Sequence, residues 1–572
     1  MIAGAYWYMQ NGLLSVPWFT PALNGGNLLY ADPESIYFSF PQFVAFFADP
    51  LTSITITYAT FSTLGMWGMY LLLRKIFDCG FGSSLLGAAL FLFNGFFTYR
   101  MVVGHLPYHA FMLLPWILFC VLRRYEPQAI YNDIVCAAGA AFMLSYCFYA
   151  GGIHFFIPVT LSIVVVGLIY SHIFVERGIR YVWRRVGLFF TITGMLCASK
   201  LIAAFNVIKN VPREAYLLPG IPNAIDLIIV PIRSLFFSAI TRQEANQTFE
   251  NLQWSLDRHE FEYGITFVPL VLLIAGISRR IIRQHRKICF PVWRKKQWLF
   301  FIAALFLLMV PIFANYYSPQ WNAFLKSLPV IKNSSALVRW YAMYIPIGII
   351  FSVLMFKQLD VEPAMKSLLA GCLIIIVVAV NWTHDKTFSF VNNYNYRSIS
   401  QGYTAAKDRG RIPIIEYVGL SATIDTPASK ITYSKDNLIN IGVSYLLARS
   451  SLFGYKLEFF PQKEKLKIGR VNQVSEGFFN MINPSCYLYP DENGCGPGDR
   501  FRTDQIVQLT NFVNYRHFNF EVPIGQRIAN WMSLITFLSC LSFLFFHQAL
   551  RYWRHLSRAD TVFEDSEKLT NE

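Results

Sequence analysis

Charged residues are scarce in this 572-residue chain, where Asp, Glu, Lys and Arg together make up 15% of the sequence. Soluble domains have about a quarter of their residues charged. Hydrophobic residues make up 55% of the chain and aromatic residues 17%. This composition excludes an ordinary soluble domain and predicts a polytopic α-helical membrane protein.

Acidic residues are scarcer than basic ones, which leaves a formal net charge of +15. A positive excess can indicate nucleic-acid binding. In a membrane protein it is typical of cytoplasmic loops, because Lys and Arg resist translocation. We therefore expect the lipid bilayer, and no nucleic acid, as a partner of the chain.

The chain lacks a P-loop, a Rossmann fingerprint, a zinc motif and a Ser-His-Asp arrangement. ATP-driven transport by this chain alone is therefore not expected. Most of the ten cysteines fall in apolar spans or basic loops, where they behave as small apolar residues. Cys486 and Cys495 differ, because they flank the turn-rich YLYPDENG. They predict a disulfide in an oxidising compartment, and the alternative, a metal pair, lacks nearby His or further Cys.

What the sequence has in abundance is apolar runs of about the length that crosses a hydrocarbon core. The run from 134 to 174 is too long for one helix, so we divide it at Gly151-Gly152. About eleven spans are predicted, near residues 51–73, 81–99, 106–122, 134–150, 153–174, 187–205, 264–278, 298–315, 340–356, 366–382 and 527–548.

Basic residues sort onto alternate loops between these spans. The densest loop, Arg279–Lys296, holds eight Lys and Arg and no acid, which places that side in the cytoplasm. The other basic positions on this side are Arg74-Lys75, Arg123-Arg124, Arg177, Arg180, Arg184, Arg185, Arg551, Arg554 and Arg558. The segments left outside the cytoplasm are 1–50, 100–105, 206–263, 316–339 and 383–526.

The domain prediction follows from this topology. Residues 1–382 form a transmembrane domain with outer loops 1–50 and 206–263, and 527–550 form the last transmembrane helix. Charges and turn residues return in 383–526, where pieces such as Lys430–Tyr433 and Ile439–Ala448 are strand-like. We expect a small α/β or β-rich extracytoplasmic domain there, and a cytoplasmic tail over 551–572 whose acidic end, Asp560–Glu572, is disordered.

The outer N-terminal segment has no signal sequence and no span before it that could carry it across the membrane. We therefore expect that one further helix precedes Met1, which would bring the total to about twelve.

Several cations fall at the outer ends of spans: Arg100, Lys200 and Arg339. Placing Lys or Arg at membrane depth is costly, so such residues tend to be functional, although snorkelling to headgroups or a structural ion pair is the alternative. Arg binds phosphate bidentately and Lys binds it as a point charge. The set predicts a phosphate or pyrophosphate site at the outer membrane face.

Other polar residues on the same side could supply acid–base chemistry. His105 could donate to a phosphate or transfer a proton. The carboxylates Asp32, Glu34, Glu260 and Glu262 are candidates for a general base that deprotonates a sugar hydroxyl.

Four stretches of the sequence carry a resemblance to a known family. They are PWFTPALNGGNLLYADPES, the run from YLLLRKIFDCGFG through GHLPYHAFMLLPWILFCVLRR, ASKLIAAFNVIKNVPRE, and SALVRWYAM. Over about residues 15–356 the chain resembles the bacterial YfhO-like membrane proteins of the GT-C glycosyltransferase superfamily. The turn at Gly104-His105 and its flanking spans are the most specific part.

The resemblance implies a GT-C fold and transfer of a sugar from a polyprenyl-phosphate donor to a glycan or lipid acceptor outside the bacterial cytoplasmic membrane. It implies that Arg100, His105, Lys200 and Arg339 contact the lipid phosphate. Trp18, Tyr30 and Tyr37 would shape the sugar pocket. The acid of GT-C enzymes commonly follows the first transmembrane helix, which this sequence lacks, so Asp32 and Glu34 remain candidates for the base.

Two other function classes stay open. A transporter or flippase of lipid-linked sugars would use the same outer cations, but should show paired repeats and polar helices at the midplane. A non-catalytic accessory protein of envelope glycan assembly would present residues 383–526 to a partner. As to cofactors, some GT-C enzymes need a divalent cation and others do not. The outer carboxylates here are too scattered to indicate such a site.

Overall fold

The computed structural model of the chain describes the residues on which the following sections rest. They are 1–20, 27–125, 130–174, 179–210, 217–252, 256–285, 295–329, 331–332, 334–383, 387–388, 400, 403–404, 407, 416–417, 470–471, 473–517 and 519–546. The strand-like pieces expected at 430–433 and 439–448 and the tail 551–572 lie outside these residues.

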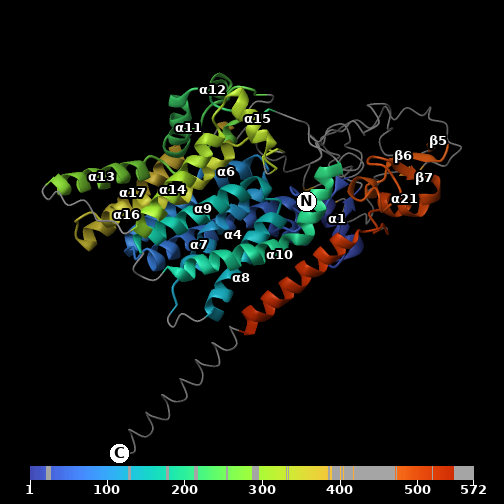
Figure 1. The fold of residues 1–572 in the computed structure, drawn as a ribbon, viewed down its shortest axis with the longest axis horizontal. Helices are drawn as coiled ribbons and strands as arrows, with labels where there is room; N and C mark the ends of the chain where they lie inside the picture. Colours follow the sequence, from blue (N-terminus) through green and yellow to red (C-terminus); the bar gives the residue numbers. More distant parts are fainter. Residues whose placement is uncertain are drawn as a thin grey trace, which may run out of the picture.

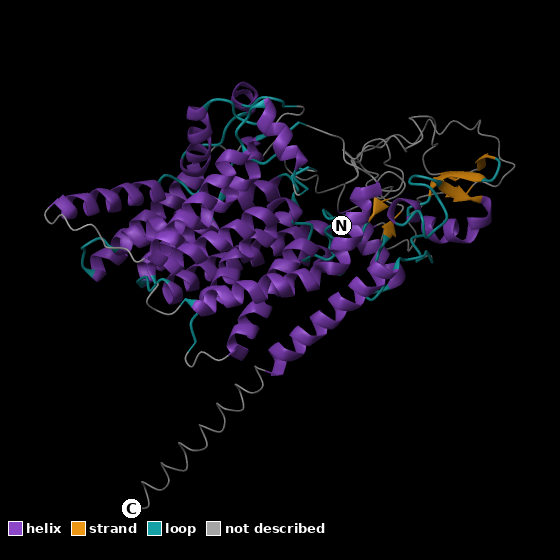
Figure 2. Cartoon of the chain, in the orientation of Figure 1, coloured by secondary structure: helices purple, strands orange, loops and turns teal. Residues whose placement is uncertain are grey.

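Helices make up most of the described structure, and the few strands gather at one end of the molecule (Figure 2). Eight of the described helices are long and apolar enough to cross a membrane, as expected of a multi-pass helical membrane protein. They are Phe81–Val102, Ile130–Tyr149, Ile153–Ile173, Arg180–Asn210, Lys295–Ala314, Val338–Lys357, Pro363–Thr383 and Ile524–Phe546.

Two further predicted spans correspond to shorter apolar helices, Leu106–Leu122 and Val268–Arg279. The predicted span 51–73 is also helical, as α4 (Pro50–Leu71), but it does not reach the hydropathy of the eight. Its first half is rich in Thr and Ser, and hydroxyl groups lower its apolar character. Ten of the eleven predicted spans therefore fall on apolar helices, and the eleventh on a more polar one.

The helices follow one another with short breaks (Figure 1). Besides α4, the described helices up to residue 210 are α1 (Ile2–Asn11), α3 (Phe40–Val44), η1 (Leu72–Ile76), α5 (Phe81–Leu92), α6 (Gly95–Val102), η2 (Leu106–Leu113), α7 (Leu114–Leu122), α8 (Ile130–Tyr149), α9 (Ile153–Ile173) and α10 (Arg180–Asn210). Those that follow are α11 (Ala224–Phe236), α12 (Arg242–Thr248), η4 (Arg258–Glu260), α13 (Val268–His285), α14 (Lys295–Ala314), α15 (Pro319–Ser327), η5 (Val338–Met343), α16 (Tyr344–Lys357) and α17 (Pro363–Thr383).

The turn between α8 and α9 lies at Gly151-Gly152, where the long apolar run was divided. Gly151 has a φ of +86°, a conformation that glycine adopts without the steric cost of a side chain. A Cβ atom at this position would lie 2.5 Å from the carbonyl oxygen of Glu34. The turn therefore lets the N-terminal loop pack directly on the end of α8.

The strands are short. Antiparallel β1 (Phe19–Thr20) and β2 (Asn27–Leu28) pair in the N-terminal loop, and β3 (Glu416–Tyr417) pairs in parallel with β4 (Arg470–Val471). The largest sheet has the antiparallel order β5 (Gln473–Ser475), β6 (Phe478–Ile482), β7 (Arg500–Arg502). It is followed by η6 (Thr503–Gln505) and α21 (Ile506–Val513), and α20 (Ser485–Leu488) lies between β6 and β7.

Cys486 and Cys495 form a disulfide with a Cα–Cα distance of 5.7 Å. It closes the connection between β6 and β7, where the sequence pattern placed it. Among the described residues, all other cysteines are free.

The sheet and the N-terminal loop share one apolar core. Phe19, Leu28 and Tyr30 of the loop pack with Phe479 and Tyr489 from the C-terminal part and with the C-terminal end of α10. In Figure 1, β5–β7 and α21 lie beside α1 at one end of the molecule, while α13, α16 and α17 lie at the other. The segment expected as an extracytoplasmic domain therefore packs, in its described part, on the first forty residues of the chain.

Candidate functional site

A buried ion cluster joins three segments that are far apart in the sequence. Arg100 comes from the last turn of α6, Glu260 from η4, and Arg339 from η5. Arg100 donates through Nη1 to Glu260 Oε1 at 3.0 Å and through Nη2 to Oε2 at 2.6 Å. Arg339 donates through Nε to Oε2 at 2.9 Å and through Nη2 to Oε1 at 2.8 Å. One carboxylate thus receives four charge-assisted hydrogen bonds in two bidentate pairs.

The cluster is nearly closed to solvent. The side chain of Arg100 is 0% exposed, that of Glu260 6% and that of Arg339 15%. Burial opposes ionisation of Glu260, but the adjacent guanidinium groups of Arg100 and Arg339 hold the pKa of its carboxyl well below the usual value. Two guanidinium charges face one carboxylate, so the cluster keeps a net positive charge. A buried net positive charge is suited to an anionic ligand.

Two histidines flank the cluster. Arg100 Nη1 lies 3.4 Å from His105 Nδ1, and the His105 ring packs edge-on against that of His259, 5.0 Å between centroids. Burial, followed by the charge of Arg100, lowers the pKa of His105 to about 3. His105 is therefore neutral at physiological pH. Because a guanidinium can only donate, Nδ1 is the acceptor and the proton resides on Nε2.

Three polar atoms of this cluster are buried without a hydrogen-bond partner in the described structure: Arg100 Nε, His259 Nδ1 and the hydroxyl of Tyr108. The guanidinium carbon of Arg100 lies 4.6 Å from the centre of the Tyr108 ring. Buried polar groups are nearly always satisfied. Their concentration around one positive cluster marks it as a place where a polar ligand can bind.

Glu262 lies beside this cluster but belongs to a different ion pair. Arg258 Nε donates to Glu262 Oε2 at 3.2 Å, and the Arg258 guanidinium lies 5.2 Å from the centre of the Tyr99 ring. The side chain of Glu262 also closes around Gly95, where a Cβ atom would lie 2.8 Å from Glu262 Cγ. Glu262 therefore fixes the start of α6 against the loop that carries Glu260.

A second cluster forms around Lys200, a residue of α10 whose side chain is buried. Its Nζ donates to the carbonyl of Tyr149 at 3.2 Å and lies 3.5 Å from that of Ser35. The carboxylate of Asp32 is close enough to interact electrostatically with this ammonium group. Asp32 is itself 7% exposed and accepts a hydrogen bond from the backbone N–H of Glu34 at 2.8 Å. The structure thus brings Asp32 and Lys200 together.

Glu34 lies between the two clusters. Its Oε1 is 3.0 Å from His154 Nε2 of α9, and its charge also acts on Arg339. The side chain is 36% exposed. The N-terminal loop therefore places two carboxylates at the same end of the helix bundle as the arginine cluster, Asp32 toward Lys200 and Glu34 toward Arg339.

The aromatic residues of the loop pack in apolar cores. Trp18 and Tyr30 have ring centroids 4.7 Å apart, and Trp18 also contacts Phe520. The Tyr30 hydroxyl lies 2.6 Å from Ser199 Oγ. Tyr37 is buried beside α1. Of the three, Tyr30 contacts the residue that precedes Lys200 in α10, and Trp18 packs on Tyr30.

Sequence reasoning did not identify Tyr108 and His154 as members of these clusters. Both lie near features that were noticed, His105 in the first case and the Gly151-Gly152 turn in the second. Nothing in the spacing of an aromatic residue after His105 indicates that its ring faces Arg100. Among the described residues, no group of three or more His, Cys, Asp or Glu side chains could hold a metal ion.

Comparison with known proteins gives no relative from which a role could be transferred. No family model, no curated protein and no solved structure matches the chain.

Proposed function

We propose that the chain is an integral membrane glycosyltransferase of GT-C type, with a GT-C fold of eleven or twelve spans. It would transfer a sugar from a polyprenyl-phosphate donor to an acceptor at the outer face of the bacterial cytoplasmic membrane. The observation that carries the proposal is the buried, net positive Arg100–Glu260–Arg339 cluster, beside a loop that presents Asp32 and Glu34. The stretches that resemble YfhO-like proteins contain Asp32, Glu34, Arg100 and Arg339 but not Glu260.

The arginine cluster supplies the chemistry for the donor phosphate. Glu260 holds Arg100 and Arg339 in fixed orientations, so little entropy is lost when they bind an anion. Arg100 Nε and the Nε2–H of His105 are the donors available to phosphate oxygens. In this assignment Glu260 and Glu262 are positioning residues, since each carboxylate is already engaged by guanidinium groups.

The carboxylate that we assign as general base is Asp32. The ammonium group of Lys200 interacts electrostatically with this carboxylate, and a positioned carboxylate can accept a proton from a reacting hydroxyl. In the transfer step an acceptor hydroxyl attacks the anomeric carbon and its proton passes to Asp32. The bond between that carbon and the phosphate oxygen breaks, and its electron pair leaves with the polyprenyl phosphate. Arg100 and Arg339 stabilise the negative charge that develops on the leaving oxygen.

The test is to profile lipid-linked sugars in cells that carry Asp32→Asn or Arg339→Lys in place of the parent chain. The first change removes the base, and the second keeps the charge but removes the bidentate geometry. We expect an unused polyprenyl-phosphate sugar to accumulate and an acceptor glycan to lose one sugar.

Matched controls are Asp504→Asn and Arg527→Lys, the same replacements at exposed residues of the C-terminal part, where Asp504 pairs with Arg502 and Arg527 with Glu521. They should leave both pools as in the parent. An unchanged lipid pool and an unchanged glycan in the Asp32 and Arg339 variants, at normal protein level, would overturn the enzymatic proposal.

A further inference from the structure

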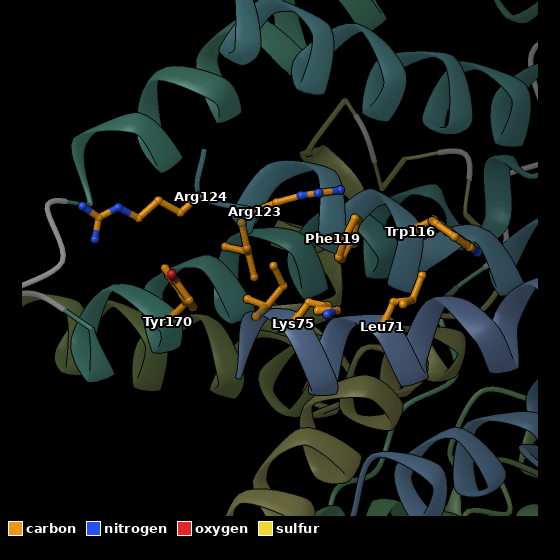
Figure 3. A pocket seen from close by; sticks show the side chains of 9 residues that line it. Leu71, Lys75, Trp116, Phe119, Arg123, Arg124 and Tyr170 are labelled. Atoms are coloured by element: carbon orange, nitrogen blue, oxygen red, sulfur yellow. The ribbon is translucent and has the colours of Figure 1, made fainter. Parts of the chain in front are cut away.

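A pocket of about 470 Å³ lies at the end of the bundle that carries the basic loops. This volume is within the usual range of ligand-binding pockets. Its lining comes from the end of α4 and η1, from α7 and from α9: Leu71, Lys75, Ile76, Trp116, Phe119, Leu122, Arg123, Arg124 and Tyr170. Figure 3 shows Lys75, Phe119 and Trp116 around the pocket, whereas Arg124 extends away from the other labelled side chains.

The charged residues that line the pocket are all basic. It holds Lys75, Arg123 and Arg124, and no acidic residue is among the lining residues that the structure describes. The positions 74–75 and 123–124 are two of the basic clusters that the charge distribution assigns to the cytoplasmic side. The pocket therefore faces the cytoplasmic leaflet, at the opposite membrane face from Arg100 and Asp32.

Local structure fixes the position of these groups. Lys75 lies in the π-helical turn η1, where the N–H of Phe77 donates to the carbonyl of Leu72. Such turns change the direction of the side chains that follow and are frequent at functional sites. The Arg123 guanidinium carbon lies 5.2 Å from the centre of the Phe119 ring, so an aromatic surface supports it.

The other walls of the pocket are mainly apolar. Ile76, Phe119 and Leu122 are buried, and Trp116 is held by a hydrogen bond from Nε1 to the carbonyl of Leu64 at 2.8 Å. A ligand that used the whole pocket would combine an anionic group with an apolar part. A free inorganic anion would bind the basic residues but would not use the apolar walls.

We propose that this pocket binds the phosphate headgroup of an anionic lipid of the cytoplasmic leaflet, with Lys75 and Arg123 on the phosphate and the lipid chain along Leu71 and Trp116. Basic pockets between helices at a cytoplasmic face have the chemistry that recognises such headgroups. The site is separate from the proposed donor site and does not depend on it.

The test measures lipid retention by the purified full chain, by native mass spectrometry after exchange into detergent with phosphatidylglycerol or phosphatidylcholine. The variant is Lys75→Gln with Arg123→Gln. The control is Lys295→Gln with Lys296→Gln, which removes the same charge from exposed positions on the same membrane side. We expect the parent and the control to prefer phosphatidylglycerol, and the variant to lose about 25-fold in affinity, roughly fivefold for each basic residue.

Lys75→Gln alone, at an exposed side chain, should lose about fivefold and does not disturb the core. Equal retention of both lipids by the parent, or an equal loss in the control, would overturn the proposal. So would a result in which inorganic phosphate stabilises the parent but not the variant while neither lipid is preferred, because the site would then bind free phosphate.

Discussion

At the scale of single residues, Glu260 has the largest expected effect on stability. Replacing it with Gln removes the shared counter-charge of Arg100 and Arg339, which would remain buried. Breaking a buried ion pair in this way costs about 3–5 kcal/mol, so we expect a clear fall in the thermal midpoint of the detergent-solubilised protein. Glu521→Gln, at an exposed pair with Arg527, should change it little. Equal thermal midpoints for the Glu260 and Glu521 variants would contradict the burial of the Arg100–Glu260–Arg339 cluster.

His105 makes stability depend on pH. Its folded-state pKa of about 3 lies below the ordinary value of 6.5, so between these values the unfolded chain binds a proton that the folded chain does not. Its contribution is complete above pH 6.5 and is lost as the pH falls, by about 1.4 kcal/mol per pH unit. His105→Asn should flatten the dependence of the thermal midpoint on pH between 4.5 and 6.5. A slope that matches the parent would contradict the neutral, buried imidazole.

At the scale of elements, the turn between α8 and α9 controls how the N-terminal loop sits. Gly151→Ala places a Cβ atom 2.5 Å from the Glu34 carbonyl in a left-handed conformation, which costs at least about 1–2 kcal/mol. We expect a lower thermal midpoint and faster hydrogen exchange over residues 30–38. Gly194→Ala in α10, where a Cβ would meet nothing within 4 Å, should be neutral or stabilising. Similar behaviour of both variants would refute the close packing.

Helical elements were the part of the structure most accessible from the sequence, because long apolar runs have few alternatives to a membrane-crossing helix. The division at Gly151-Gly152 and the last helix, 524–546 against an expected 527–548, illustrate this. Contacts between elements were not accessible. Arg100 and Glu260 are 160 residues apart, and their pairing depends on how α6 packs beside η4, which hydropathy does not encode.

For the same reason, the sequence does not show which role each charged residue has in the site. Outer position alone made Glu260 a candidate base and Arg339 a phosphate ligand. Only the geometry indicates that one carboxylate orients two guanidinium groups, while Asp32 lies with Lys200.

At the scale of the whole molecule, the C-terminal part covers the N-terminal loop, and the Cys486–Cys495 disulfide stabilises that cover. Removing a cross-link between residues 9 apart in sequence is expected to cost about 2–3 kcal/mol on the chain-entropy account. Cys486→Ser with Cys495→Ser should therefore raise the protease sensitivity of residues 15–38 and 485–515. The helical bundle should stay resistant. Cleavage that begins in the bundle, or no added cleavage, would count against this arrangement.

From this cover, the Tyr489 hydroxyl donates to Gln526 Oε1 of the helix Ile524–Phe546 at 2.9 Å. Gln526 Nε2 donates to the Ser199 carbonyl at 2.9 Å and to Asn530 Oδ1 at 2.7 Å. Ser199 precedes Lys200, so the helix Ile524–Phe546 packs on the turn of α10 that carries Lys200. The position of Lys200 therefore depends on this helix as well as on the N-terminal loop.

The contact between the two ends of the chain also has a consequence for biosynthesis. Asn11 Nδ2 donates to the Tyr515 carbonyl at 2.7 Å, across a separation of 504 residues. At bacterial and eukaryotic elongation rates the ribosome needs about 25–100 s to add that length. Throughout most of this interval Phe19, Leu28 and Tyr30 lack their C-terminal packing partners, such as Phe479 and Tyr489. The nascent protein thus carries an incompletely covered apolar surface until residues 479–515 have been synthesised.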